Sequence, residues 1–217
     1  APSYRGLHIL ALLTAAATFV LLFAGGLVTS TGSGLAVPDW PLSFGQVFPP
    51  MEGGVLFEHG HRLVASLVGA LTVVLALWVV LRDPRPRVRV LALVALFAVV
   101  VQGILGGVTV LYRLPLAVSV AHPCLAQLFF CLTVALATVT GPAWERTRPR
   151  PAAGAEALLP QLAAVTTALV FAQVFLGALM RHMGAGLAIP DFPLAFGRLV
   201  PPLVTPYITV HFAHRVG

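Results

Sequence analysis

Apolar residues occur along this chain in stretches of about 20 or more, separated by short polar segments. A helix needs about 20 such residues to cross the ~30 Å of hydrocarbon in a bilayer. The apolar stretches therefore predict membrane-spanning helices at Leu7–Val28, Phe57–Leu81, Val88–Leu111, Leu114–Thr140 and Leu158–Met180. A sixth helix is expected to begin near Thr205, but only about 18 Å of helix fits before Gly217. We therefore expect the chain to stop within that helix.

Composition places the chain among polytopic membrane proteins. Of 217 residues, 59% are hydrophobic and only 9% are charged, so a water-soluble fold would lack polar residues to cover its surface. The net charge of +6 comes from arginines, with no lysine in the chain. A basic balance can indicate nucleic-acid binding, but in a membrane chain it marks the cytoplasmic loops instead. We expect the chain to associate with the lipid bilayer and not with nucleic acid.

The arginines gather on alternate connections between the predicted helices. One side carries Arg5, Arg82, Arg85, Arg87, Arg89, Arg146, Arg148 and Arg150. The other side carries only Arg113, Arg181 and Arg198. The positive-inside rule then predicts a multi-pass protein of the plasma membrane with its N-terminus in the cytoplasm and its Gly/Pro-rich loops outside. The first apolar run is too long for a signal peptide.

An internal repeat organises the chain. The segment "GSGLAVPDWPLSFGQVFPP" at 32–50 recurs as "GAGLAIPDFPLAFGRLVPP" at 184–202, and "EHGHR" at 58–62 is followed by "HFAHR" at 211–215. Glycine and proline are too dense in the long segments for a helix or strand, so we expect structured caps over a helix bundle. The predicted fold is all-α, with two pseudo-symmetric four-helix units covering residues 1–150 and 151–217, the second of them incomplete.

Histidines near the outer ends of the predicted helices are candidate metal ligands. Glu58 and His61 are three residues apart and share a helix face. His61 is expected ~7 Å deep and His122 ~10 Å deep on parallel helices, so their imidazoles lie at similar depth. Two such imidazoles suit the axial positions of haem iron, although a buried histidine can also be a structural group. His59 points off the Glu58 face and is expected to be solvated.

The charged neighbours of these histidines allow more than one role. Glu58 is suited to act as a general base or proton shuttle, or to form an ion pair with Arg62 four residues on. Arg62 and Arg215 are suited to pair with haem propionates, or alternatively to extend to lipid headgroups. His211 occupies the position of Glu58 in the second copy, so only the first half has the acid.

Together these motifs resemble the haem A synthase family: "GSGLAVPDWPL", "EHGHR", His122 and the repeated "HFAHR". The resemblance implies an eight-helix enzyme of two similar bundles that oxidises the C8 methyl group of haem O to a formyl group, giving haem A. It further implies that His61 and His122 flank the substrate haem, with Glu58 as the catalytic acid. His214 would be one ligand of a haem b in the second half.

Cysteine placement departs from that family. Many members have a cysteine pair in the first outer loop, where this chain has Val37 and Ser43. Cys124 and Cys131 are seven residues apart on one predicted helix, about 10 Å in rise, which is too far for a disulfide. Both are expected to pack as small apolar residues.

Three functions are therefore considered. The leading hypothesis is a haem-modifying oxidoreductase serving terminal oxidases, with haem O synthase, an electron donor or acceptor protein and a second copy of the chain as expected partners. The first alternative is a di-haem b-type electron-transfer cytochrome that leaves the porphyrin unaltered. The second is a proton-coupled transporter that uses the intramembrane histidines and Glu58 as a relay.

Overall fold

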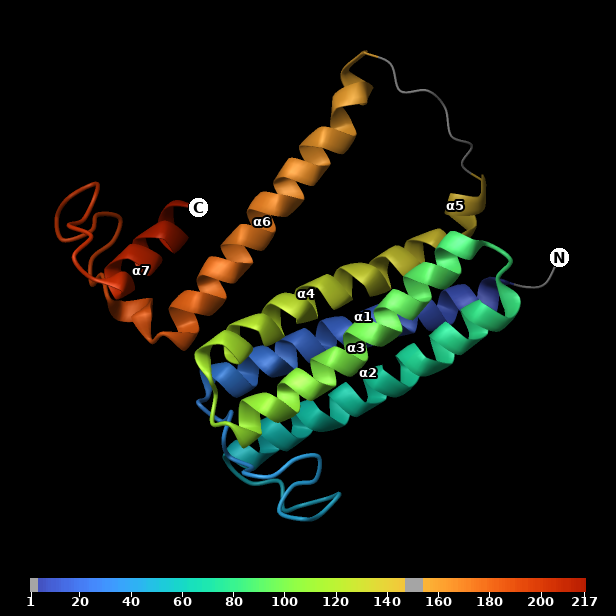
Figure 1. Ribbon diagram of the computed structural model, residues 1–217, viewed down its shortest axis with the longest axis horizontal. Coiled ribbons are helices and arrows are strands. Elements are labelled where there is room, and N and C mark those ends of the chain that lie inside the picture. Colours follow the sequence, from blue (N-terminus) through green and yellow to red (C-terminus); the bar gives the residue numbers. More distant parts are fainter. Residues whose placement is uncertain (1–3, 147–153) are drawn as a thin grey trace. The chain divides into compact units, whose positions relative to one another are not determined.

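The computed structural model describes residues 4–146 and 154–217, and its regular structure is helical (Figure 1). The helices are α1 (Tyr4–Ser30), α2 (Gly54–Arg82), α3 (Pro86–Leu111), α4 (Leu116–Val139), α5 (Pro142–Arg146), η1 (Gly154–Leu158), α6 (Leu159–His182), η2 (Ala185–Leu187) and α7 (Pro206–Val216). Within the described residues, five helices are long and apolar enough to cross a membrane, and they coincide with the five predicted spans. The all-α class and the polytopic membrane organisation are confirmed.

The described residues form two compact units. The first contains residues 4–115 and 125–146, and the second contains residues 116–124 and 154–217. The first turns of α4 thus belong to the second unit, although α4 is one continuous helix. The predicted boundary between residues 150 and 151 lies outside the described residues, as do Arg148 and Arg150.

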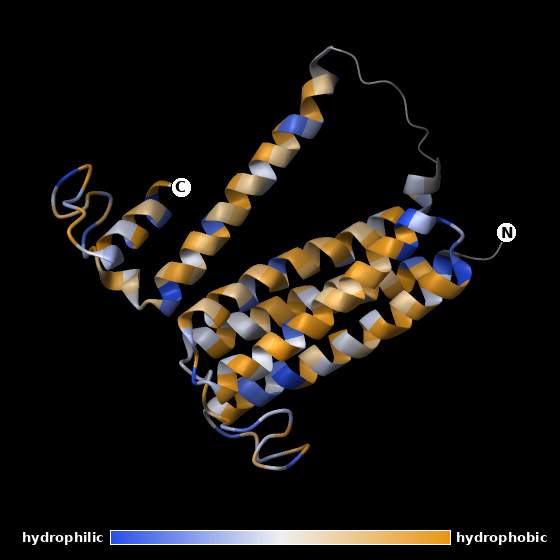
Figure 2. Cartoon of the chain, viewed as in Figure 1, coloured by the Kyte–Doolittle hydropathy of each residue, from blue (hydrophilic) through white to orange (hydrophobic). Residues whose placement is uncertain are grey.

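Small and branched residues make the core of the first unit. The buried cluster contains Leu7, Ala11, Val68, Leu75, Ala76, Val79, Val88, Ala92, Ala95, Ala98, Phe129, Leu136 and Ala137. Alanine predominates on α3, and small residues let helix backbones approach closely in a membrane. Large apolar side chains such as Phe19, Phe23 and Phe97 remain exposed on the helices, which are apolar over most of their surface (Figure 2). This distribution fits helices whose outward solvent is lipid.

An ion pair between Asp83 and Arg85 stabilises the connection between α2 and α3. Asp83 is fully buried, and its carboxylate accepts hydrogen bonds from the backbone N–H and the guanidinium of Arg85, with Nη2 at 2.6 Å. Nη1 of Arg85 also donates to the carbonyl of Val139 at the end of α4, at 2.9 Å. Burial raises the pKa of Asp83, but the hydrogen bonds from Arg85 outweigh it and hold that pKa below its usual value.

Replacing Asp83 with Asn should destabilise the first unit. The amide loses the charge that Arg85 pairs with, and a hydrogen bond to a charged group contributes about 1.5–3 kcal/mol. Because the pKa of Asp83 is depressed in the folded protein, this contribution is present above the unfolded pKa near 3.9 and is lost as the pH falls through the folded value. Thermal unfolding in nanodiscs at neutral and acidic pH measures the difference, which should narrow in acid. Arg87→Ala, at an exposed position, is the control.

Candidate functional site

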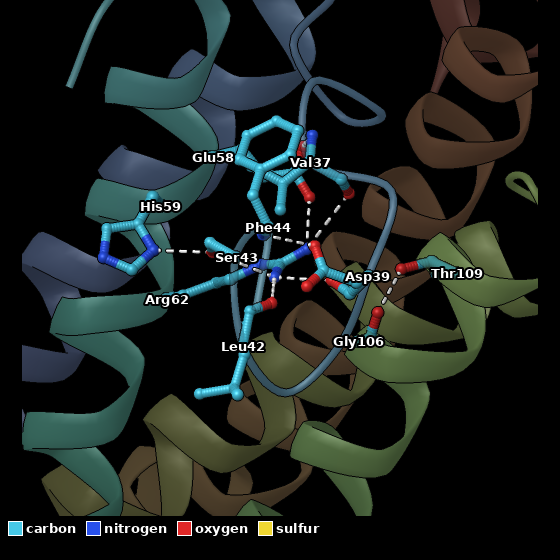
Figure 3. A network of polar contacts seen from close by, with 10 residues as sticks. All are labelled: Val37, Asp39, Leu42, Ser43, Phe44, Glu58, His59, Arg62, Gly106 and Thr109. Carbon is cyan, nitrogen blue, oxygen red and sulfur yellow. Dashed lines mark hydrogen bonds and ion pairs between the residues drawn. The ribbon is translucent and has the colours of Figure 1, made fainter. Parts of the chain in front are cut away.

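The first turns of α2 carry a buried carboxylate that faces the loop before the helix. Glu58 is only 4% exposed. Its Oε1 accepts a hydrogen bond from Nη2 of Arg62 at 2.7 Å, and its Oε2 accepts one from the backbone N–H of Val37 at 2.8 Å (Figure 3). The spacing of four residues places Glu58 and Arg62 on one face of α2. The ion pair expected as one role of Glu58 is therefore confirmed.

Arg62 holds the first loop, which we define as residues 31–53, onto α2. Its Nη1 donates to the carbonyls of Asp39 and Leu42, both at 2.8 Å, and its Nη2 donates to that of Val37 at 3.3 Å. The planar guanidinium has enough donors to serve all these acceptors and Glu58 together. The alternative that Arg62 extends to lipid headgroups is wrong, because its donors turn onto the loop instead. Its pairing with a haem propionate stays a prediction.

The first loop is itself a folded cap. The carboxylate of Asp39 accepts hydrogen bonds from the backbone N–H groups of Phe44, at 2.7 Å, and Gly45, at 2.8 Å. The Gly45 and Phe44 amides hold the pKa of Asp39 below its ordinary value. The Trp40 ring lies so close to α3 that a Cβ at Gly107 would approach it to 2.7 Å. The expectation of a structured cap is confirmed for this loop.

The second loop, residues 183–205, has the same internal contacts in the second unit. The Asp191 carboxylate accepts from the N–H groups of Phe196 and Gly197, both at 2.7 Å. Nη1 of Arg215 donates to the carbonyls of Asp191, at 2.6 Å, and Leu194, at 3.2 Å. Each contact joins residues that are the repeat counterparts of those in the first loop.

His211 replaces Glu58 in this second arrangement. Its Nδ1 accepts a hydrogen bond from the N–H of Ile189 at 3.2 Å, as Glu58 does from Val37. Its Nε2 lies 3.0 Å from Nε of Arg215. Because a neutral imidazole accepts at one nitrogen only, the ring accepts from Ile189 or from Arg215 but not from both at once. An imidazole and a carboxylate thus occupy the same structural position, between a loop amide and an arginine. Arg215 also turns onto its loop rather than toward headgroups, so that alternative is wrong for it as well.

His59 is buried, contrary to the sequence prediction. It is 5% exposed, and its Nδ1 lies 2.7 Å from Oγ of Ser43. The expectation of a solvated side chain considered only the helix, whereas the first loop folds over the face that carries His59 (Figure 3). Sequence reasoning also gave no role to Ser43, whose side chain is fully buried.

His61 and His214 each pack against a helical glycine. A Cβ at Gly25 would lie 3.2 Å from Cε1 of His61, and a Cβ at Gly177 would lie 2.9 Å from Cε1 of His214. Gly25 and Gly177 are separated by the repeat offset of 152 residues, which is the pattern that could have identified them. Within the described chain, Nδ1 of each histidine is buried without a hydrogen-bond partner. A buried ring nitrogen left unpaired costs about 1–3 kcal/mol, so both rings fit a role as metal ligands.

His122 lies on α4, partly buried and directly before Pro123. Because it belongs to the second compact unit, its pairing with His61 stays a prediction. Among the described residues, no three His, Cys, Asp or Glu side chains gather as a metal site.

The two cysteines differ in their surroundings. Cys124 is buried, as expected of a small apolar residue, and Cys131 is exposed on α4, so the expectation of packing is wrong for it. Both are free thiols.

The fold and the site define a polytopic helical membrane protein in which folded loops bury an acid or a histidine beside helix-borne imidazoles. Residues 8–217 match the family described as cytochrome oxidase assembly protein. The haem A synthases of Symbiobacterium thermophilum and Halalkalibacterium halodurans are each 34% identical to this chain, over 98% and 99% of it and 71% and 72% of their own lengths. That of Shouchella clausii is 33% identical over 98% of this chain and 71% of its own length. The chain belongs to the haem A synthase family.

Replacing Gly25 with Ala should displace the His61 ring and weaken haem binding. The new methyl group would lie 3.2 Å from Cε1, which forces the ring or α1 to move by a few tenths of an ångström. The neighbouring Gly26→Ala is the matched control, because a Cβ there meets nothing within 4 Å. Haem content and the position of the Soret band in the purified proteins measure the effect. Equal haem content and spectra in both variants would contradict contact between this glycine and a haem ligand.

Proposed function

We propose that this chain oxidises the C8 methyl group of haem O to a formyl group and so produces haem A for terminal oxidases. Its membership of the haem A synthase family supports this activity. The observation that carries the proposal is the buried carboxylate of Glu58, held by Arg62 and a loop amide three residues before His61. A cytochrome that only transfers electrons has no need of an acid at that position.

His61 and His122 are the proposed ligands of the substrate haem. The buried ring nitrogen of His61 and its contact with Gly25 support the first assignment. His122 follows from its similar predicted depth on a parallel helix. His214, packed on Gly177, is the proposed ligand of a haem b in the second half, where that group would supply electron transfer when bound. The substrate half corresponds to residues 1–150, and the second half begins at 151.

Glu58 is the proposed catalytic acid and base. Converting a methyl to a formyl group adds oxygen and removes electrons and protons, so a proton acceptor is required beside the reacting carbon. The two hydrogen bonds to Glu58 fix the direction of its carboxylate and satisfy it while it is buried. The folded first loop covers this carboxylate and excludes bulk water, which strengthens every electrostatic interaction beneath it.

Arg62 and Arg215 are the proposed partners of the haem propionates. Each directly follows a proposed ligand histidine in the sequence. The Arg62 side chain is 14% exposed while it binds the loop, and a guanidinium is a strong partner for carboxylates.

The membrane arrangement follows from the same proposal. The N-terminus lies in the cytoplasm and both loops lie outside the plasma membrane, as the arginine distribution indicates. Haem O synthase supplies the substrate, an electron donor or acceptor protein carries the redox equivalents, and copies of the chain associate as a homo-oligomer.

Replacing Glu58 with Gln should abolish haem A formation while haem remains bound. Glutamine keeps the shape of the side chain but cannot accept a proton from the substrate, and loss of a general acid or base typically costs 10²–10⁴-fold in rate. Haem extracted from the membranes and separated by chromatography gives the ratio of haem O to haem A. Glu52→Gln, at an exposed position, is the matched control. Undiminished haem A formation by Glu58→Gln would remove this residue from the mechanism.

The purified protein should show a Soret band, and its extracted haem should include formyl-bearing or hydroxylated porphyrin. This outcome separates the proposal from both alternatives. An electron-transfer cytochrome would yield only unaltered haem, and a proton-coupled transporter would show no Soret band. The asymmetry between Glu58 and His211 favours the enzyme, because two equivalent haem sites would not need different residues there.

A further inference from the structure

Two buried polar side chains of the first unit are missing from the repeated arrangement in the second. Ser43 and His59 form a hydrogen-bonded pair beneath the first loop, with 2.7 Å between Oγ and Nδ1. Their counterparts are Ala195 and Phe212, which cannot form such a bond. Burying two polar groups that the second copy replaces with apolar ones needs a reason in the first unit.

The second loop shows that this pair is not needed to fold the cap. The turn around Asp191 and the contacts of Arg215 with the loop carbonyls are all present with Ala195 in the position of Ser43. The two loops can therefore be compared directly. Each is bound by an equivalent arginine, and only the first has the serine and the histidine.

Ser43 connects His59 to the arginine that holds the acid. Its Oγ lies 3.3 Å from Nη1 of Arg62, so it is bonded on one side to Arg62 and on the other to His59 (Figure 3). A guanidinium only donates hydrogen bonds, so the serine oxygen accepts from Arg62. This is a third and longer contact of Nη1, beside its bonds to the carbonyls of Asp39 and Leu42. The serine proton then points to Nδ1 of His59. In neutral His59 the ring proton is on Nε2, an atom that is buried without a partner in the described structure.

The two guanidinium groups bind their loops in the same way, each with Nη1 on two carbonyls and Nη2 on a third. They differ in the contact with the residue at the position of Glu58. Arg62 uses Nη2 for the Glu58 carboxylate while Ser43 adds an acceptor at Nη1. Arg215, without that acceptor, reaches His211 with Nε. The serine oxygen is thus present in the copy where Nη2 contacts a carboxylate, and absent in the copy where Nε contacts an imidazole.

We infer that Ser43 and His59 are positioning residues for Glu58. His59 accepts a hydrogen bond from the Ser43 hydroxyl, so that the lone pairs of the serine oxygen point toward Arg62. Arg62 in turn fixes the direction of the Glu58 carboxylate. This inference rests on the proposed function, because orientation of Glu58 matters for rate only if the carboxylate acts on the substrate. Misplacing a catalytic group by about 1 Å can cost as much as 10²-fold in rate.

Ser43→Ala and His59→Phe, which install the residues of the second copy, test the inference. Each should lower kcat for haem A formation by about tenfold or more while haem content and KM for haem O stay unchanged. The double variant should be no slower than either single variant, because the two side chains act as one unit. His59→Asn should restore most of the rate, because the asparagine Oδ1 can replace Nδ1 as the acceptor for Ser43. Ala195→Ser in the second loop is the matched control and should leave kcat unchanged.

The infrared carboxylate stretch of Glu58 provides a reading that does not depend on activity. It is isolated by labelling the holoenzyme with 13C-glutamate and subtracting the spectrum of Glu58→Gln. The band should shift in Ser43→Ala and His59→Phe and return in His59→Asn. A lower thermal midpoint with unchanged kcat and an unchanged band would overturn the inference and leave the pair as a simple tether. A shifted band together with undiminished haem A formation by Glu58→Gln would remove Glu58 from the proposed mechanism and leave the positioning standing.

Discussion

One arginine on the helix that follows it organises each loop of this protein. The first loop has neither helix nor strand, so its carbonyls lack the partners that regular structure provides, and backbone groups near a membrane must still be satisfied. Arg62 supplies donors to three of these carbonyls and to Glu58 at once. Because the same guanidinium binds both, folding the loop and orienting the acid are a single event. Arg215 does the same for the second loop, with His211 as the buried partner.

The shared frame explains how two halves with similar loops can serve different chemistry. The loop amide and the arginine both donate toward this position. A carboxylate accepts both hydrogen bonds, whereas a neutral imidazole accepts at one nitrogen only. Both loops nevertheless have the same contacts with their arginine, so this loop fold does not require the acid. The additional pair of Ser43 and His59 occurs in the half that has the acid. The arginine contacts are common to both loops, and the residues placed between the arginine and the loop differ between the two halves.

Hydropathy predicted the helices well because the bilayer sets their length, and that constraint acts on each segment separately. The loops were recognised as repeats and caps, but their contacts depend on residues about 20 positions away on the following helix, which no local pattern encodes. The prediction that His59 is solvated failed for this reason. Its face of the helix is buried by the first loop, which lies elsewhere in the sequence. Gly25 and Gly177 were missed although they share the repeat offset, because a glycine in an apolar helix resembles any small packing residue.

The contact between glycine and histidine shows which feature the two halves have in common. At both Gly25 and Gly177 the missing side chain brings an imidazole against the preceding long helix, and the closer approach is in the second unit. Glu58 has no such counterpart, since His211 replaces it. The helical scaffold is thus arranged in both units around a histidine packed on a glycine, and the acid is a substitution within one loop frame. A change from binding a ligand to acting on it would therefore require no rearrangement of the helices. It is confined to the residue at the position of Glu58 or His211, which the arginine already contacts.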